Sequence, residues 1–230
     1  MMKPASKFFT ILFLIVACID NVAVFYGSTI THAAIKPLLM PALLLLLVFS
    51  HTAARAKKII ITGLIFSFLG DVFLLFESNA PLFFMAGLSC FLITHICYII
   101  YFLNIKSALP SLLQKQPWMA ALVAGYCVSL VLFLNPYLAN LKIPVTLYAV
   151  VICMMILCSL HVFLKITKPA NILFVAGALF FAASDSILAI NKFYKPFAAA
   201  NVLIILTYCT AQFCIVQGVI KNRIGTLPAT

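Results

Sequence analysis

The sequence predicts an all-α membrane protein, a bundle of about eight transmembrane helices. Of the 230 residues, 66% are hydrophobic and only 8% are charged. A soluble domain of this size needs far more charge to cover its surface. The apolar residues also form long runs, and about 20 apolar residues are what a helix needs to cross the hydrocarbon of a bilayer.

The expected spans follow one another with short connections, at residues 8–26, 35–50, 59–76, 82–104, 118–135, 143–164, 171–190 and 197–220. The first resembles a signal peptide, but it is long enough to span and lacks a clear cleavage site, so we expect it to be retained. Pro37 and Pro41 predict a kinked or re-entrant start for the second span. Because no connection is long enough to separate domains, residues 1–230 are expected to form a single transmembrane domain.

Basic residues give the chain a net charge of +11, and they stand at the ends of the apolar runs. There they act as topology signals and interfacial anchors, so nucleic acid is not expected as a partner. With the N-terminus inside, the inner side holds Lys3, Lys7, Arg55, Lys57, Lys58, Lys106, Lys115, Lys165, Lys168, Lys221 and Arg223. The outer side holds only Lys36, Lys142, Lys192 and Lys195. This excess predicts that both termini are cytoplasmic, and the short loops favour a bacterial inner membrane.

An internal repeat links two of the spans. Residues 63–76 read GLIFSFLGDVFLLF and residues 177–190 read GALFFAASDSILAI. In each copy a glycine precedes an aspartate by eight positions, and a small residue stands directly before the aspartate: Gly63, Gly70 and Asp71 in the first, Gly177, Ser184 and Asp185 in the second. The two helices run in the same direction, which suggests two parallel four-helix repeats as the origin of the fold.

Three of the four acids, Asp20, Asp71 and Asp185, lie within expected spans. An ionisable group in hydrocarbon is costly, so such residues usually face a polar interior and are functional. Structural pairing with a basic group is the alternative, and it stays open above all for Asp20. Two carboxylates that face each other in a low-dielectric site cannot both ionise easily, which suits general acid–base catalysis or proton-coupled transport. We expect Asp71 and Asp185 to face each other across a polar cavity open to the outer half.

Lys36 and Lys192 stand at the outer ends of the second and seventh expected spans. They either extend to the interface as ordinary anchors, or hold an anionic head group, or neutralise a carboxylate. Asn191, beside Lys192, adds a neutral donor.

Two polar pairs lie on single helix faces, His95 with Tyr98 and Tyr208 with Gln212. Interhelical hydrogen bonding and substrate contact both remain open for them. A metal site could use Asp71, Asp185 and His95, but no HxxxH or HExxH spacing is present, so no metal is expected. His32 and His51 are expected in loops without a role, and the eight cysteines are expected to be packing residues.

Several motifs occur in order: Lys36-Pro37, GLIFSFLGD at 63–71, THICY at 94–98, GALFFAASD at 177–185, Asn191-Lys192-Phe193, Tyr208 and Ala211-Gln212. Together they resemble the YhhN-like lysoplasmalogenase family over about residues 36–216. The resemblance implies a multi-pass membrane enzyme that needs no cofactor. It implies hydrolysis of the vinyl ether bond of lysoplasmalogens to a fatty aldehyde and a glycerophospho-alcohol, typically glycerophosphoethanolamine.

On this hypothesis the substrate is a lysophospholipid within membrane lipid, and Asp71 and Asp185 are the catalytic residues. We expect the other polar positions of the motifs to bind substrate: Lys36, His95, Tyr98, Ser184, Asn191, Lys192, Tyr208 and Gln212. The competing hypotheses are a proton-coupled transporter of a small molecule and a metal-dependent lipid hydrolase.

Overall fold

The computed structural model of the chain describes residues 4–50 and 52–222. Within these ranges eight helical segments are long and apolar enough to cross a membrane, and no strand is present. The predicted class, an all-α membrane protein with eight spans, is confirmed. Lys3, His51 and Arg223, which the sequence analysis used, lie outside the described residues.

The chain divides into two compact units, of which the first ends at Tyr101 and the second covers Phe102–Asn222. The first unit thus contains the first four spans and the second unit the last four. The boundary lies near the end of helix α5 (Pro81–Leu103). That the whole chain acts as a single domain stays a prediction.

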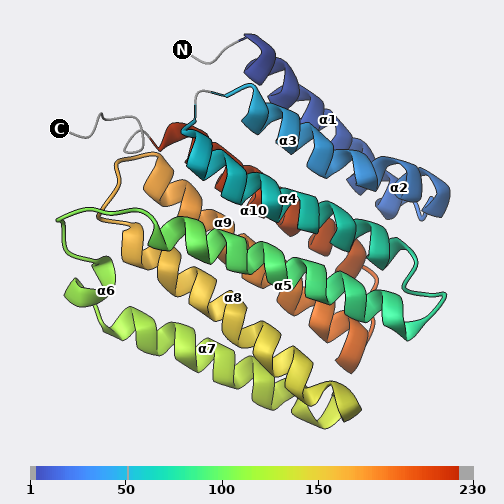
Figure 1. The fold of residues 1–230 in the computed structure, drawn as a ribbon. Coiled ribbons are helices and arrows are strands. Elements are labelled where there is room, and N and C mark those ends of the chain that lie inside the picture. The colour runs from blue at the N-terminus through green and yellow to red at the C-terminus, as the bar shows by residue number, and fades with distance from the viewer. Residues whose placement is uncertain (1–3, 51, 223–230) are drawn as a thin grey trace. The chain divides into compact units, whose positions relative to one another are not determined.

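The first unit contains α1 (Pro4–Phe25), α2 (Thr29–Ile35), the 3-10 turn η1 (Lys36–Leu38), α3 (Leu39–Val48), α4 (Ala54–Leu75) and α5. Helix α1 packs against α3, and α3 packs against α4 (Figure 1). Leu39, Leu43, Leu46 and Leu47 of α3 are fully buried. Their spacing places them on one face of the helix, which forms the centre of this unit.

The second span is longer than the sequence predicted. It begins at Thr29 rather than at residue 35, and it consists of α2 and α3 joined by η1. The expected interruption is present at Pro37, which follows the first residue of η1 and cannot donate a backbone hydrogen bond. The expectation that His32 lies in a loop is wrong, because His32 is part of α2. Hydropathy did not predict this helix because α2 contains polar residues.

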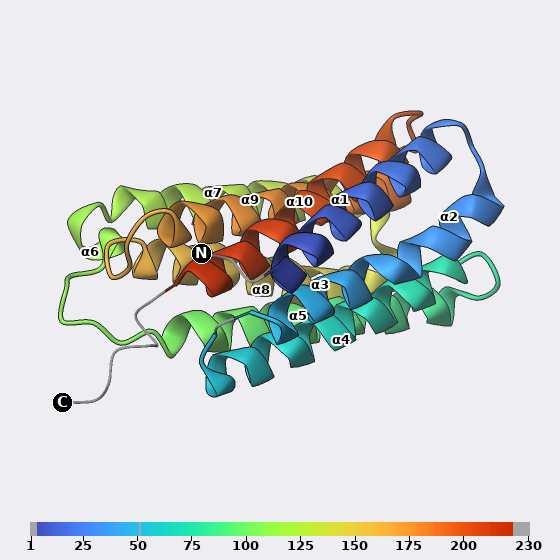
Figure 2. The same cartoon turned by 90° about the horizontal axis from the view of Figure 1, so that it is seen from above.

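The second unit contains α6 (Leu112–Lys115), α7 (Trp118–Leu134), the 3-10 turns η2 (Asn135–Tyr137) and η3 (Ala139–Leu141), α8 (Lys142–Val162), α9 (Ala170–Ala189), the π-helical turn η4 (Ile190–Tyr194) and α10 (Ala200–Lys221). Helices α9 and α10 lie side by side along most of their length (Figure 2). Helix α8 packs against both α7 and α9. A small cluster of Leu134, Leu138 and Val145 closes one end of the α7–α8 pair.

The two copies of the repeat pack in the same way within their own units. A Cβ atom added at Gly63 of α4 would lie 3.1 Å from the Tyr98 ring of α5, and one added at Gly177 of α9 would lie 2.6 Å from Ile215 of α10. In both copies, therefore, the glycine permits close approach of the helix that follows. The repeat in the sequence is also a repeat in packing.

Candidate functional site

In the first unit, the repeated aspartate meets a basic residue from the preceding span. Asp71 of α4 is almost fully buried, and its Oδ1 atom lies 3.7 Å from Nζ of Lys36 in η1. This distance is that of an ion pair without a close hydrogen bond. Lys36 was expected at the outer end of its span. It lies inside the span instead, because the span begins seven residues earlier at Thr29. Of the roles considered for Lys36, pairing with a carboxylate is the one this geometry favours.

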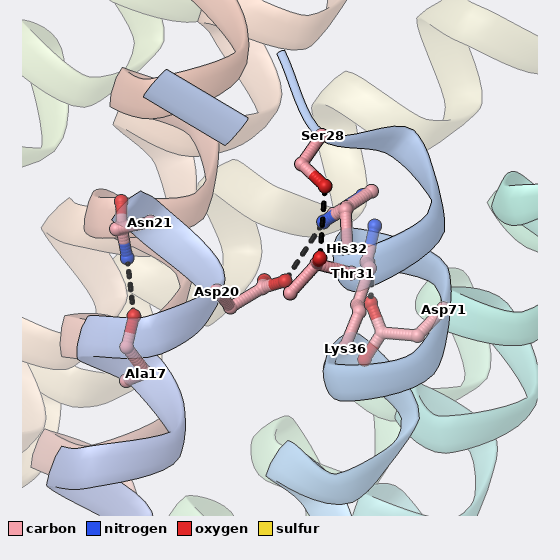
Figure 3. Close-up of polar contacts among 8 residues, drawn as sticks. All are labelled: Ala17, Asp20, Asn21, Ser28, Thr31, His32, Lys36 and Asp71. Carbon is pink, nitrogen blue, oxygen red and sulfur yellow. Dashed lines mark hydrogen bonds and ion pairs between the residues drawn. The ribbon is translucent and has the colours of Figure 1, made fainter. Parts of the chain in front are cut away.

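A second acid–base pair lies one helical turn away. Asp20 of α1 is fully buried, and its Oδ1 atom is 2.8 Å from Nδ1 of His32 in α2. His32 and Lys36 are four residues apart and so share one face of the α2–η1 segment. Figure 3 shows Asp20 turned toward His32 from one side of this segment, and Asp71 turned toward Lys36 from the other. Structural pairing of Asp20, left open by the sequence, is therefore what is found, with a histidine as the partner.

Two hydroxyl groups that the sequence analysis did not single out connect α4 to α5. The Thr94 hydroxyl donates to the carbonyl oxygen of Gly63 at 3.0 Å, and the Ser67 hydroxyl donates to Thr94 Oγ1 at 3.1 Å. Both side chains are fully buried. The sequence could have indicated both residues by their positions, since Ser67 is one helical turn from Asp71 and Thr94 directly precedes His95.

In the second unit, the repeated aspartate also meets the preceding span, but its partner there is a neutral group. The phenol of Tyr148 in α8 donates to Oδ2 of Asp185 at 3.1 Å. Beside it, the hydroxyl of Tyr126 in α7 makes a short hydrogen bond with Ser186 and donates to the carbonyl oxygen of Ala182 at 3.3 Å. Sequence reasoning missed both tyrosines. The signal available was a polar tip on an aromatic residue inside an apolar span.

Asp185 opens onto a pocket between α7, α8 and α9. The lining consists mainly of apolar side chains, with the polar groups gathered around Asp185. Its residues are Tyr126, Cys127, Leu130, Val131, Leu134, Val145, Tyr148, Ala149, Ile152, Cys153, Asp185, Ser186 and Ala189. The pocket therefore combines an apolar lining with one carboxyl group, as many small-molecule sites do.

The remaining predicted residues of the second unit have structural contacts of their own. Ser184 donates to the carbonyl oxygen of Ile204 in α10 at 3.0 Å, and the Asn191 side chain accepts from the backbone N–H of Phe197 at 3.1 Å. The ring of Tyr208 packs edge-on against Phe181 of α9. Gln212 is fully buried in α10, whereas Lys192 is exposed in η4. Substrate binding by this group stays a prediction.

His95 and Tyr98 of α5 are both fully buried. The Tyr98 ring packs over Gly63, which is two helical turns from Asp71 along α4. Their role in substrate binding also stays a prediction. Among the residues described by the structure, no three His, Cys, Asp or Glu side chains come together as a metal site would require.

Comparison with known proteins places these features in a family. The profile of the YhhN family matches residues 31–219, a range that contains both repeated aspartates, Lys36 and the Asp185 pocket. The chain belongs to the YhhN family. The match begins after Asp20, so the Asp20–His32 pair is only partly inside the matched region.

Relatives that cover most of the chain carry the name of one enzyme. A protein of Mycobacterium bovis named "Lysoplasmalogenase" is 32% identical over 208 residues, which cover 86% of this chain and 75% of the relative. The human protein named "Lysoplasmalogenase TMEM86A" is 32% identical over 168 residues, covering 71% of this chain and 66% of the relative. No solved structure matches the chain.

Proposed function

We propose that this integral membrane protein is a lysoplasmalogenase. It hydrolyses the vinyl ether bond of a lysoplasmalogen and releases a fatty aldehyde and a glycerophospho-alcohol, glycerophosphoethanolamine or glycerophosphocholine. Family membership and the names of the relatives support the activity. The observation that carries the proposal is the Asp185 carboxyl group, hydrogen-bonded to Tyr148, at the polar side of an apolar pocket within the bilayer-spanning helices.

The chemistry begins with a proton. A vinyl ether hydrolyses when its β-carbon accepts a proton, which turns the double bond into an oxocarbenium ion. Water then adds to the cationic carbon and loses a proton, and the resulting hemiacetal collapses to the aldehyde and the free alcohol. Carbon protonation is slow in water at neutral pH, so a positioned acid accelerates the first step. One water molecule is consumed and the proton is returned.

We assign the proton-donating role to Asp185, because its carboxyl group lines an apolar pocket. Asp71, which forms an ion pair with Lys36, carries the negative charge that stabilises the cation and orients the attacking water. This division of roles is the one that two carboxylates have in glycosidases. The predicted cavity shared by the two aspartates stays a prediction and is part of the proposal.

The distribution of basic residues supports the proposed orientation, with both termini cytoplasmic. A bacterial inner membrane is the proposed location. With this orientation Lys36 and Lys192 belong to the outer half. Lys36 pairs with Asp71, and the exposed Lys192 is the residue that binds the phosphate of the head group.

The decisive experiment uses the purified full-length protein in lipid nanodiscs. A 1-alkenyl lysophosphoethanolamine should release aldehyde, and the matching saturated alkyl ether should release none, because it has no double bond to protonate. Asp185→Asn is the control for catalysis by the protein itself, and it should release little or no aldehyde. Retention of activity in a chelator would argue against the metal-dependent alternative. Lack of aldehyde release with either an ethanolamine or a choline head group would refute the proposal.

A further inference from the structure

The side-chain oxygen atoms of the second-unit pocket come from four of the residues that line it. These residues are Tyr126, Tyr148, Asp185 and Ser186, and the other lining residues are Leu, Val, Ile, Ala or Cys. A water molecule held inside a protein needs about two to four polar partners. Among the lining residues, these four therefore define where a water molecule can be bound.

Two of the four oxygens form a pair of their own. Tyr148 is engaged with the acid, because its phenol donates to Oδ2 of Asp185 at 3.1 Å. The hydroxyl groups of Tyr126 and Ser186, the hydroxyl pair, are hydrogen-bonded to each other. Both also lie against one acceptor, the carbonyl oxygen of Ala182, at 3.3 Å and 2.6 Å respectively. Since Tyr126 is within electrostatic reach of Asp185, the hydroxyl pair lies beside the acid in one pocket.

The hydroxyl pair has acceptor capacity that its own contacts do not use. Each hydroxyl group supplies one proton and two acceptor lone pairs. Three hydrogen bonds link the two hydroxyl groups and the Ala182 carbonyl group, but the two residues supply only two protons for them. Of the lone pairs on the two hydroxyl oxygens, at most one receives a proton from within the pair. The hydroxyl pair can therefore accept a hydrogen bond from a further O–H group.

The proposed reaction needs an O–H group held in this way. When an acceptor holds a water molecule by its hydrogen, a lone pair of the water oxygen stays available for the cationic carbon. The apolar lining limits the supply of bulk water to the pocket. Capture of the cation there depends on a water molecule that is already bound and oriented, and such positioning accelerates the addition.

We propose that Tyr126 and Ser186 bind the water molecule that adds to the oxocarbenium ion, and that Asp185 receives the proton which this water loses. The water oxygen forms a bond to the cationic carbon, one of its O–H bonds breaks, and the proton goes to the carboxylate that donated the first proton. The inference rests on the proposed function and deepens it by naming the contacts of the nucleophile. Asp71 acts on the cation and the water by its charge, whereas the hydroxyl pair contacts the water.

Deuterium exchange separates capture of the cation from its formation. The full-length protein in nanodiscs hydrolyses a 1-alkenyl lysophosphoethanolamine in heavy water, and unreacted lipid is recovered at partial conversion for mass spectrometry. In the wild type the bound water captures the cation before it loses a proton, so the recovered lipid should contain no deuterium. Slower capture lets the cation return a proton to Asp185, and the vinyl ether that re-forms carries deuterium at its β-carbon.

Tyr126→Phe and Ser186→Ala each remove one hydroxyl group of the pair. Each should slow capture by up to about tenfold, the scale of one hydrogen bond. Deuterium should then appear in the recovered lipid, and kcat should fall while KM stays within about twofold of the wild type.

The matched controls are Tyr137→Phe and Ser129→Ala. Tyr137 is exposed in η2, Ser129 donates to a carbonyl oxygen of its own helix α7, and neither lines the pocket. Both controls should match the wild type in kcat and should return lipid without deuterium.

Folded variants that keep the wild-type kcat and return lipid without deuterium overturn the inference. A rise in KM alone also overturns it, because the hydroxyl pair would then bind the lipid rather than the water. If one variant loses the helical circular dichroism spectrum, the other decides. Deuterium in lipid recovered from the wild type would overturn the inference without any variant. Lack of aldehyde release from the wild type refutes the proposed function, whereas unchanged variants beside an active wild type refute this inference alone.

Discussion

Replacement of Lys36 by methionine tests the role of the buried ion pair. Methionine keeps most of the apolar stem and removes the charge, so Asp71 is left as a buried carboxylate without this cation. At 3.7 Å the pair is worth about 4 kcal/mol for an effective dielectric constant of about 20. The Lys36 side chain is 13% exposed, so solvent screens part of this, and we expect a coupling free energy of about 2–3 kcal/mol.

A double-mutant cycle isolates that coupling. The free energy of unfolding is measured by titration with sodium dodecyl sulfate in mixed micelles, for the wild type, Lys36→Met, Asp71→Asn and the double variant. Lys36→Met alone should destabilise the protein by about 3 kcal/mol, because it leaves a buried charge unpaired. In the Asp71→Asn background the same substitution should cost about 1 kcal/mol or less.

Lys142→Met is the matched control, since Lys142 is an exposed lysine at the start of α8. Its effect should stay within about 0.5 kcal/mol. If Lys36→Met costs the same with and without the Asp71 carboxylate, to within about 0.5 kcal/mol, the ion pair does not stabilise the protein. Lys36 would then be an ordinary interfacial anchor.

Three further outcomes are expected from single substitutions. Asp71→Asn and Asp185→Asn should each lower aldehyde release by about 10²–10⁴-fold with the helical circular dichroism spectrum retained; near-normal turnover would remove that residue from the mechanism. Tyr148→Phe should lower kcat about tenfold through loss of the hydrogen bond to Asp185, and an unchanged kcat would show that this hydroxyl group does not position the acid. Gly177→Ala should destabilise the protein by about 1–3 kcal/mol because its Cβ meets α10. In contrast, Gly125→Ala faces open space and should be neutral or stabilising by up to about 1 kcal/mol; equal effects of the two would contradict the packing.

The spans could be predicted from the sequence because each of them is a long apolar run. The predicted span 118–135 and the observed helix Trp118–Leu134 differ by one residue at one end. The start of the second span could not be predicted in this way. Helix α2 contains two threonines and a histidine, and their low hydropathy predicts a loop. In the folded protein, tertiary contacts such as the Asp20–His32 pair satisfy polar side chains of this helix.

The sequence did not identify the residues that contact the buried acids. Asp71 and Asp185 were visible as charges inside spans, and the repeat selected them as a pair. However, helices in a bilayer are apolar on all sides, so periodicity does not reveal which face meets which neighbour. Tyr148 is one of several tyrosines in the spans, and only the packing of α8 on α9 assigns it to Asp185.

Helix α2 has a thermodynamic consequence for the acids it contacts. Its seven residues include no buried one, whereas the ten residues of α3 include six. Segments with few buried contacts open locally at low free energy, so the amide hydrogens of α2 should exchange with solvent before those of α3. His32 lies in α2, and Lys36 begins the adjoining turn η1, which also contains no buried residue. A single local opening of α2 and η1 therefore separates Asp20 and Asp71 from their basic partners at the same time, although the two acids lie on different helices.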